Sequence, residues 1–130
     1  RHGDALVHGL VNVLPRATRV PGIVTVHDLS FVRTPEALPR AKRAYLDALC
    51  GKSVARARHV IAVSGQTAAD VMAHYQVPAS RISVIHNGVG AEFTPKPADA
   101  ADSMRPVRPE RYLLYVGTLE PRKNLPLLVS

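Results

Sequence analysis

The stretch YLLYVGTLEPRKNL, residues 112–125, decides the fold class of this chain. Its first five residues are apolar and favour β-structure, which predicts a strand buried on both faces, as in a parallel sheet. Gly117 then ends the strand, and two adjacent cations follow at Arg122 and Lys123. Asn124 is a good N-cap for a helix that starts at the next residue. This order of features is typical of an anion-binding site at the carboxyl edge of an α/β sheet.

The sequence before this stretch alternates strand-like and helix-like segments. Apolar, largely β-branched runs predict four more strands, at residues 4–8, 22–28, 59–63 and 81–85. This alternation predicts an α/β fold of Rossmann-like type, in which right-handed crossovers join the strands of a parallel sheet.

Two helices are expected between these strands. Pro39 opens the first, which runs to about Arg58, and Gly51 could break it near Cys50. Its buried stripe steps by three or four residues through Leu46, Leu49, Cys50, Val54 and Ala57. Ser64 is expected to cap the second helix, which is amphipathic over residues 68–75. The segment 29–38 is expected to be irregular.

Composition narrows the functional classes. The chain has 130 residues, 46% of them apolar, which is enough for a hydrophobic core. A single cysteine, Cys50, excludes an intramolecular disulfide, and no histidine spacing suggests a metal site. Only 5% of the residues are aromatic and no nucleic-acid-binding module is recognisable, so nucleic acid is not an expected partner. Because the chain lacks an initiator Met and ends within a helical pattern, we expect an internal fragment of a longer protein.

The net charge of +7 is concentrated in residues 40–58. Six Lys or Arg residues face one acid there, Asp47, which gives a local excess of +5. Such a segment is either a solvated helix face or a surface that attracts anionic lipid, nucleic acid or an acidic substrate. Residues 95–110 differ again, because four prolines in this range, together with alanine and charged residues, predict an exposed, semi-stiff linker.

Polar residues at the carboxyl ends of the predicted strands are the candidate site residues, because ligands collect at that edge of a parallel sheet. Each has a structural alternative. His27 could bind a hydroxyl or close a turn, Asp28 could orient His27 or cap a turn, and Ser64 could simply cap its helix. Asn87 and Gly88 form first a turn and second a backbone platform near a ligand.

Taken together, four motifs resemble glycosyltransferase family 4, a group of retaining, nucleotide-sugar-dependent enzymes with the GT-B fold. They occur in the order found in that family: VTVHDL (24–29), VIAVS (60–64), IHNGV (85–89) and YVGTLEPRKN (115–124). The resemblance implies that residues 1–94 are the latter half of the N-terminal, acceptor-side domain. Residues 95–110 would then be the interdomain linker, and residues 111–130 the first strand and helix start of the donor-side domain.

The resemblance also implies roles for individual residues. Lys123 and Arg122, with Gly117 and Thr118, would bind the donor diphosphate, and Lys123 would stabilise the leaving group. Many family members have Gly-Arg where this chain has Gly117-Thr118, so a hydroxyl replaces one expected cation. His27 would bind a hydroxyl of the transferred sugar. Asp28, Ser64, Asn87 and Gly88 would line the cleft.

The implied activity is transfer of a hexose, with mannose as one candidate, from a nucleotide diphosphate sugar to a glycan or lipid-linked acceptor with retention. No metal or other cofactor is implied. The expected location is the cytoplasm, with peripheral contact at the inner membrane face through residues 40–58. A nucleotide-sugar 2-epimerase and a non-catalytic phospholigand-binding module remain alternatives. The family's glycine-rich loop and paired glutamates lie outside this sequence, so the fragment itself is expected to be inactive.

Overall fold

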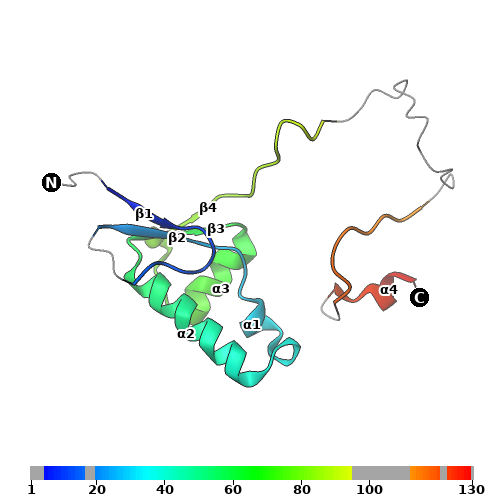
Figure 1. Ribbon diagram of the computed structural model, residues 1–130, viewed down its shortest axis with the longest axis horizontal. Helices are drawn as coiled ribbons and strands as arrows, with labels where there is room; N and C mark the ends of the chain where they lie inside the picture. Colours follow the sequence, from blue (N-terminus) through cyan, green and yellow to red (C-terminus); the bar gives the residue numbers. More distant parts are fainter. Residues whose placement is uncertain (1–4, 17–19, 95–111, 121–122, 130) are drawn as a thin grey trace. The chain divides into compact units, whose positions relative to one another are not determined.

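The computed structural model describes residues 5–16, 20–94, 112–120 and 123–129, and these divide into two compact units, residues 1–87 and 88–130. The first unit is built on a sheet of four parallel strands in the order β1-β2-β3-β4, which confirms the predicted α/β class (Figure 1). The strands are β1 (Val7–Gly9), β2 (Gly22–Val26), β3 (His59–Ala62) and β4 (Ile82–Val84).

The helices α1 (Ser30–Arg33), α2 (Arg40–Arg56) and α3 (Gly65–Tyr75) all lie on one face of this sheet (Figure 1). Strands that follow one another in sequence and in space require this, because every right-handed crossover then passes over the same face. Short 3-10 helices at Pro35–Ala37 and Ala79–Arg81 complete the connections. The core lies between the helices and the sheet, where the buried strand residues are Val24, Val26, Val60 and Ala62.

The helix α2 is continuous through Gly51, so the break considered near Cys50 does not occur. A Cβ atom at Gly51 would lie 3.0 Å from Cε1 of Tyr75, so the glycine gives the tyrosine ring of α3 room to lie against α2. The Tyr75 hydroxyl donates a hydrogen bond of 2.8 Å to Oδ1 of Asp47. Burial raises the pKa of Tyr75 and that of the Cys50 thiol. The glycine therefore serves helix–helix packing at this position.

Two helix ends in this layer are satisfied by specific side chains. Ser64 caps α3 as predicted, with its Oγ accepting a hydrogen bond of 3.1 Å from the Thr67 amide. At the C-terminal end of α2, the Arg81 guanidinium donates hydrogen bonds to the backbone carbonyls of Val54 and Ala57. These are carbonyls that a helix terminus leaves without an intrahelical partner. The predicted buried stripe of α2 is confirmed for Cys50, Val54 and Ala57, which are at most 2% exposed.

Two expectations for local structure were wrong. The segment expected to be irregular contains α1, because Leu29 is only 2% exposed and its carbonyl accepts from the amides of Val32 and Arg33. Residues 112–116, expected to form a fifth strand, are not part of a strand in the described segment 112–120. A strand needs a second strand beside it, and the described residues of the second unit contain none.

The second unit is described at residues 88–94, 112–120 and 123–129 and contains one helix in those segments, α4 (Leu125–Val129). The helix starts directly after Asn124, as predicted. Asn124 has a φ of 48°, however, which differs from the extended backbone usual for a capping residue. The predicted linker 95–110 and the cation Arg122 lie outside the described residues.

Candidate functional site

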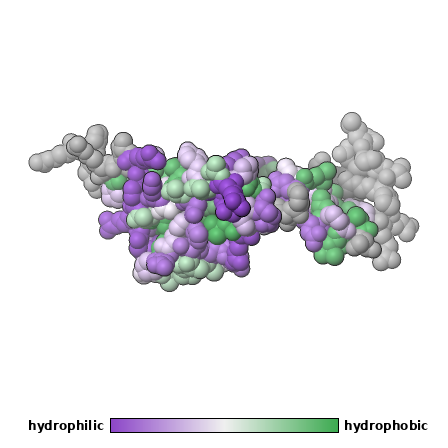
Figure 2. All heavy atoms as spheres, turned by 90° about the horizontal axis from the view of Figure 1, so that it is seen from below, coloured by the Kyte–Doolittle hydropathy of each residue, from purple (hydrophilic) through white to green (hydrophobic). Residues whose placement is uncertain are grey.

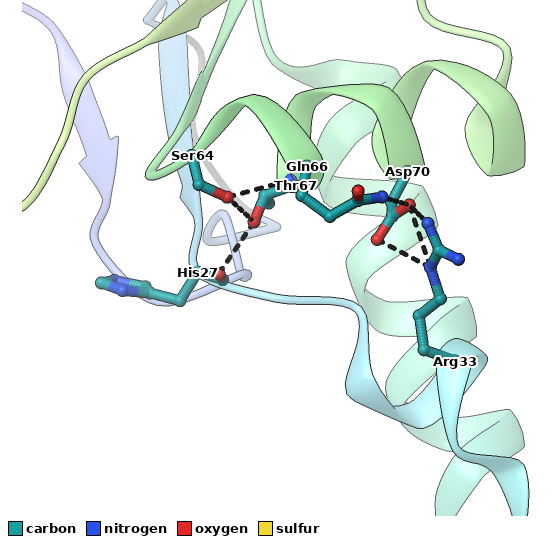
Figure 3. Close-up of polar contacts among 6 residues, drawn as sticks. All are labelled: His27, Arg33, Ser64, Gln66, Thr67 and Asp70. Carbon is teal, nitrogen blue, oxygen red and sulfur yellow. Dashed lines mark hydrogen bonds and ion pairs between the residues drawn. The ribbon is translucent and has the colours of Figure 1, made fainter.

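His27 lies at the carboxyl edge of the sheet, one residue after the end of β2, as the sequence predicted. Its ring projects away from α3 (Figure 3), and Nε2 lies 2.9 Å from the carbonyl oxygen of Leu10, in the loop after β1. Its backbone amide donates to Oδ1 of Asn12 at 3.0 Å. Its carbonyl accepts from Oγ1 of Thr67 at 3.2 Å. The backbone of His27 is thus held on both sides and its imidazole by one contact, and the residue is half-buried.

A short chain of hydroxyl groups fixes the carbonyl of His27 (Figure 3). Oγ of Ser64 and Oγ1 of Thr67 are 2.9 Å apart, and Thr67 donates onward to His27. Because the Thr67 proton is given to the carbonyl, Ser64 must donate to Thr67. Ser64 is therefore a helix cap and a support for His27, and the structure gives it no base to activate it as a nucleophile among its described contacts.

Asp28 serves the turn that follows His27. Its Oδ1 accepts a hydrogen bond of 2.8 Å from the amide of Ser30, in the first turn of α1. The described partner of the His27 ring is the Leu10 carbonyl, so the proposed use of Asp28 to orient that ring is wrong. The capping alternative for Asp28 is the one the structure supports.

Asn87 ends the first unit and Gly88 begins the second, and both are exposed. The preceding His86 has its Nδ1 3.1 Å from the carbonyl oxygen of Val63, at the end of β3. This contact brings the loop after β4 to the carboxyl edge of the sheet. The edge therefore gathers His27, Ser64 and the start of the 86–88 loop, three of the regions the sequence selected.

The donor-side candidates lie in the second unit and are described there by themselves. Gly117 has a φ of 155°, in the region that favours glycine, and a Cβ atom there would lie 2.8 Å from the Tyr115 hydroxyl. That hydroxyl donates to the Thr118 carbonyl at 2.8 Å, while Thr118 Oγ1 donates to Glu120 at 2.9 Å. Lys123 is exposed and lies two residues before α4. Because the two units are each described alone, the shared cleft stays a prediction.

An ion pair links the helices behind this edge (Figure 3). Nε of Arg33, at the end of α1, donates to both carboxylate oxygens of Asp70 in α3 at 3.0 Å. The Arg33 hydrogen bond lowers the pKa of the Asp70 carboxyl, and Gln66 adds a further hydrogen bond of 2.8 Å. The pair ties the segment after His27 to α3. Within the described ranges, no three His, Cys, Asp or Glu side chains are grouped to hold a metal ion.

Sequence reasoning missed three contributors to this arrangement: Asn12, Thr67 and the Arg33–Asp70 pair. Thr67 had a usable signal, since it stands three residues after a capping serine, where side chains meet at a helix N-terminus. Asn12 and Arg33 had none, because their partners are 15 and 37 residues away along the chain. Contacts of that range become visible only once the strands are in register.

Comparison with known proteins agrees with the motifs. The family model for Glycosyltransferase Family 4 matches residues 2–93. The O-antigen chain mannosyltransferase B of Escherichia coli is 27% identical over 125 residues, covering 94% of this chain and 32% of the relative. The O-antigen chain mannosyltransferase RfbU of Salmonella typhimurium is 30% identical over 102 residues, covering 78% and 26%.

The chain therefore spans about a third or less of the length of these curated relatives. No solved structure matches it at a significant level. The family match covers more than half of the chain and includes the whole four-stranded sheet with His27, Ser64 and Asn87. Together with the parallel sheet of the Rossmann-like type found in GT-B enzymes, this match shows that the chain belongs to glycosyltransferase family 4.

Proposed function

We propose that the whole protein transfers a hexose from a nucleoside diphosphate sugar to a glycan or lipid-linked acceptor, with retention of anomeric configuration. The observation that carries the proposal is the imidazole of His27, held at the carboxyl edge of a parallel sheet in a family 4 sequence. Ligands of open α/β sheets bind at this edge. Mannose is the first candidate hexose because two relatives are named mannosyltransferases, and their names also point to a growing glycan chain as acceptor.

In this proposal the first unit binds the acceptor and the second binds the donor. His27 binds a hydroxyl of the transferred sugar through a hydrogen bond. Lys123 and Arg122 bind the diphosphate and stabilise the negative charge that develops on it as the bond to the sugar breaks, with Gly117 and Thr118 beside them. Fixed cations placed where charge develops lower the barrier in this way. Because these two side chains supply that positive charge, the proposal requires no metal ion.

The test is an assay of the full-length protein with guanosine and uridine diphosphate hexoses, with and without a lipid-linked glycan acceptor. We expect nucleoside diphosphate release that depends on the acceptor, and a product whose anomeric coupling constant matches that of the donor. An epimerised sugar formed without acceptor would instead identify a nucleotide-sugar 2-epimerase. Tight donor binding without any turnover would identify a non-catalytic binding module.

We further propose that α2 contacts an anionic membrane at the inner face. No described helix is long and apolar enough to cross a bilayer, so this contact would be peripheral. Lys42 and Lys52 are exposed on α2, whereas Arg56 donates to the carbonyls of Leu14 and Pro15 and so serves the fold. Seen from the helical side, the surface of the first unit is largely hydrophilic (Figure 2). The exposed cations of α2, these two lysines together with Arg40, therefore supply the charge available to lipid.

Neutralising both lysines (Lys42→Gln with Lys52→Gln) is expected to lower binding to anionic vesicles about 30-fold, since each cation near such a surface contributes about 1 kcal/mol. Flotation of the full-length protein with phosphatidylserine-containing vesicles measures this. The matched control is the double change to arginine, which keeps both charges and should float like the wild type. Equal flotation with neutral phosphatidylcholine vesicles, or no flotation at all, would remove the membrane proposal.

A further inference from the structure

The loop after β1 holds His27 at two separate points. The side-chain oxygen of Asn12 accepts from the His27 amide at 3.0 Å, and the carbonyl of Leu10 lies 2.9 Å from Nε2 of the ring. Leu10 and Asn12 are two residues apart in one turn, so whatever fixes Asn12 also fixes the Leu10 carbonyl. The position of the ring is thus linked to the conformation of this loop.

Asn12 is itself anchored along the end of β2. Its backbone amide donates to the Thr25 carbonyl at 2.9 Å, two residues before His27, and its side-chain amide approaches the Asp28 carbonyl at 3.5 Å. Its φ of 53° lies in the left-handed region, which asparagine tolerates better than most residues. One side chain therefore contacts the backbone at His27 and, more weakly, at the residue after it.

These contacts decide which ring nitrogen carries the proton. A carbonyl oxygen can only accept, so Nε2 of His27 must be the donor in the bond to Leu10. In the neutral imidazole the other nitrogen, Nδ1, is then unprotonated and can only accept a hydrogen bond. The ring as a whole projects away from α3 and from the Ser64–Thr67 hydroxyl pair (Figure 3).

We propose that Asn12 is a positioning residue that holds the Leu10 carbonyl against Nε2 of His27 and so fixes the tautomer in which Nδ1 accepts a hydrogen bond from a sugar hydroxyl. The identity of the sugar ligand rests on the proposed function. The tautomer and its dependence on Asn12 do not. The two parts can therefore fail separately.

The tautomer is measured by long-range 1H–15N correlation spectra of full-length protein labelled at histidine, at a pH where the ring is neutral. The His27 signal is assigned by its loss in His27→Gln. We expect a single Nε2–H form in the wild type and a mixture of tautomers in Asn12→Gly. Glycine adopts a φ of 53° without strain, so this change removes the side chain while leaving the backbone conformation accessible.

The matched control is Gln76→Gly, because Gln76 at the end of α3 has a φ of 54° and is not described in contact with His27. It should leave the His27 tautomer unchanged. Asn12→Asp keeps the side-chain acceptor and should restore the single tautomer. A wild-type spectrum with the proton on Nδ1, or a folded Asn12→Gly variant with an unchanged His27 spectrum, would overturn the proposal. If Asn12→Gly does not fold, the wild-type tautomer and the Asn12→Asp spectrum decide.

Activity gives the second measurement. Asn12→Gly is expected to lower kcat/KM of the full-length enzyme about tenfold, the effect of one misplaced hydrogen bond. His27→Asn places an amide oxygen near the position of Nδ1 and should retain more activity than His27→Gln, whose amide lies near Nε2. The reverse order would contradict an accepting Nδ1. If the spectra are as expected but the full-length protein transfers no sugar, the positioning role of Asn12 is supported and the proposed function is refuted.

Discussion

Replacing Lys123 with alanine in the full-length protein is expected to lower kcat about 10²- to 10³-fold, with a smaller change in KM. The proposed function assigns Lys123 to the diphosphate whose charge grows as the sugar departs. Loss of one preorganised group that stabilises such charge costs about 2.7–4 kcal/mol in the transition state. Steady-state kinetics with the preferred donor measure the two constants separately.

Two matched variants accompany this change. Lys123→Arg keeps a cation at the same place and should recover part of the lost turnover, although the two cations differ in shape. Lys52→Ala removes a cation from the exposed side of α2 and should leave turnover with a water-soluble acceptor unchanged. A Lys123→Ala enzyme with normal kcat and a raised KM would contradict the leaving-group role. It would show instead that the lysine contributes equally to the bound substrate and the transition state.

The largest expected effect on stability is at Leu29, directly after the His27–Asp28 pair. Leu29 is 2% exposed and belongs to the core cluster between the helices and the sheet. Truncation of a buried leucine to alanine removes apolar contacts and leaves a cavity, which costs about 2–5 kcal/mol. We expect Leu29→Ala to lower the free energy of unfolding by that amount, measured by urea denaturation followed by circular dichroism.

Leu6→Ala is the matched control. It is the same chemical change near the same sheet, but Leu6 is 57% exposed. Its expected effect is within about 0.5 kcal/mol. Since Leu29 anchors α1, its truncation should also loosen the Arg33–Asp70 pair and the segment after His27. A Leu29→Ala protein as stable as the wild type would mean that the core closes around the smaller side chain.

Much of the first unit could be predicted from its sequence. The run Gly22–Val26 is rich in β-branched residues, and in the structure it is β2, with His27 just past its end. Ser64 was predicted to cap a helix, and its Oγ accepts from the Thr67 amide. Predictions of this kind succeed because strand propensity and capping are settled by residues adjacent in sequence.

The errors have a common physical reason. Residues 112–116 have strong strand propensity but no neighbouring strand in the described part of their unit, and propensity alone does not make a strand. Gly51 was expected to weaken α2, but the Tyr75 ring packs where a larger residue would have to displace it. In both cases the outcome depends on a partner distant in sequence: residues 112–116 have no described strand beside them, and Gly51 has the Tyr75 ring.

The sequence by itself determined the α/β class, the order of the four strands and two longer helices of the first unit, and the family 4 motifs, because these follow from local periodicity and from residue types at fixed spacing. Only the tertiary structure decided how His27 is held. Its amide, ring and carbonyl contact Asn12, Leu10 and Thr67, which lie 15, 17 and 40 residues away. Parallel strands bring such residues together at one edge of the sheet, and the spacing of the residues in sequence does not predict these contacts.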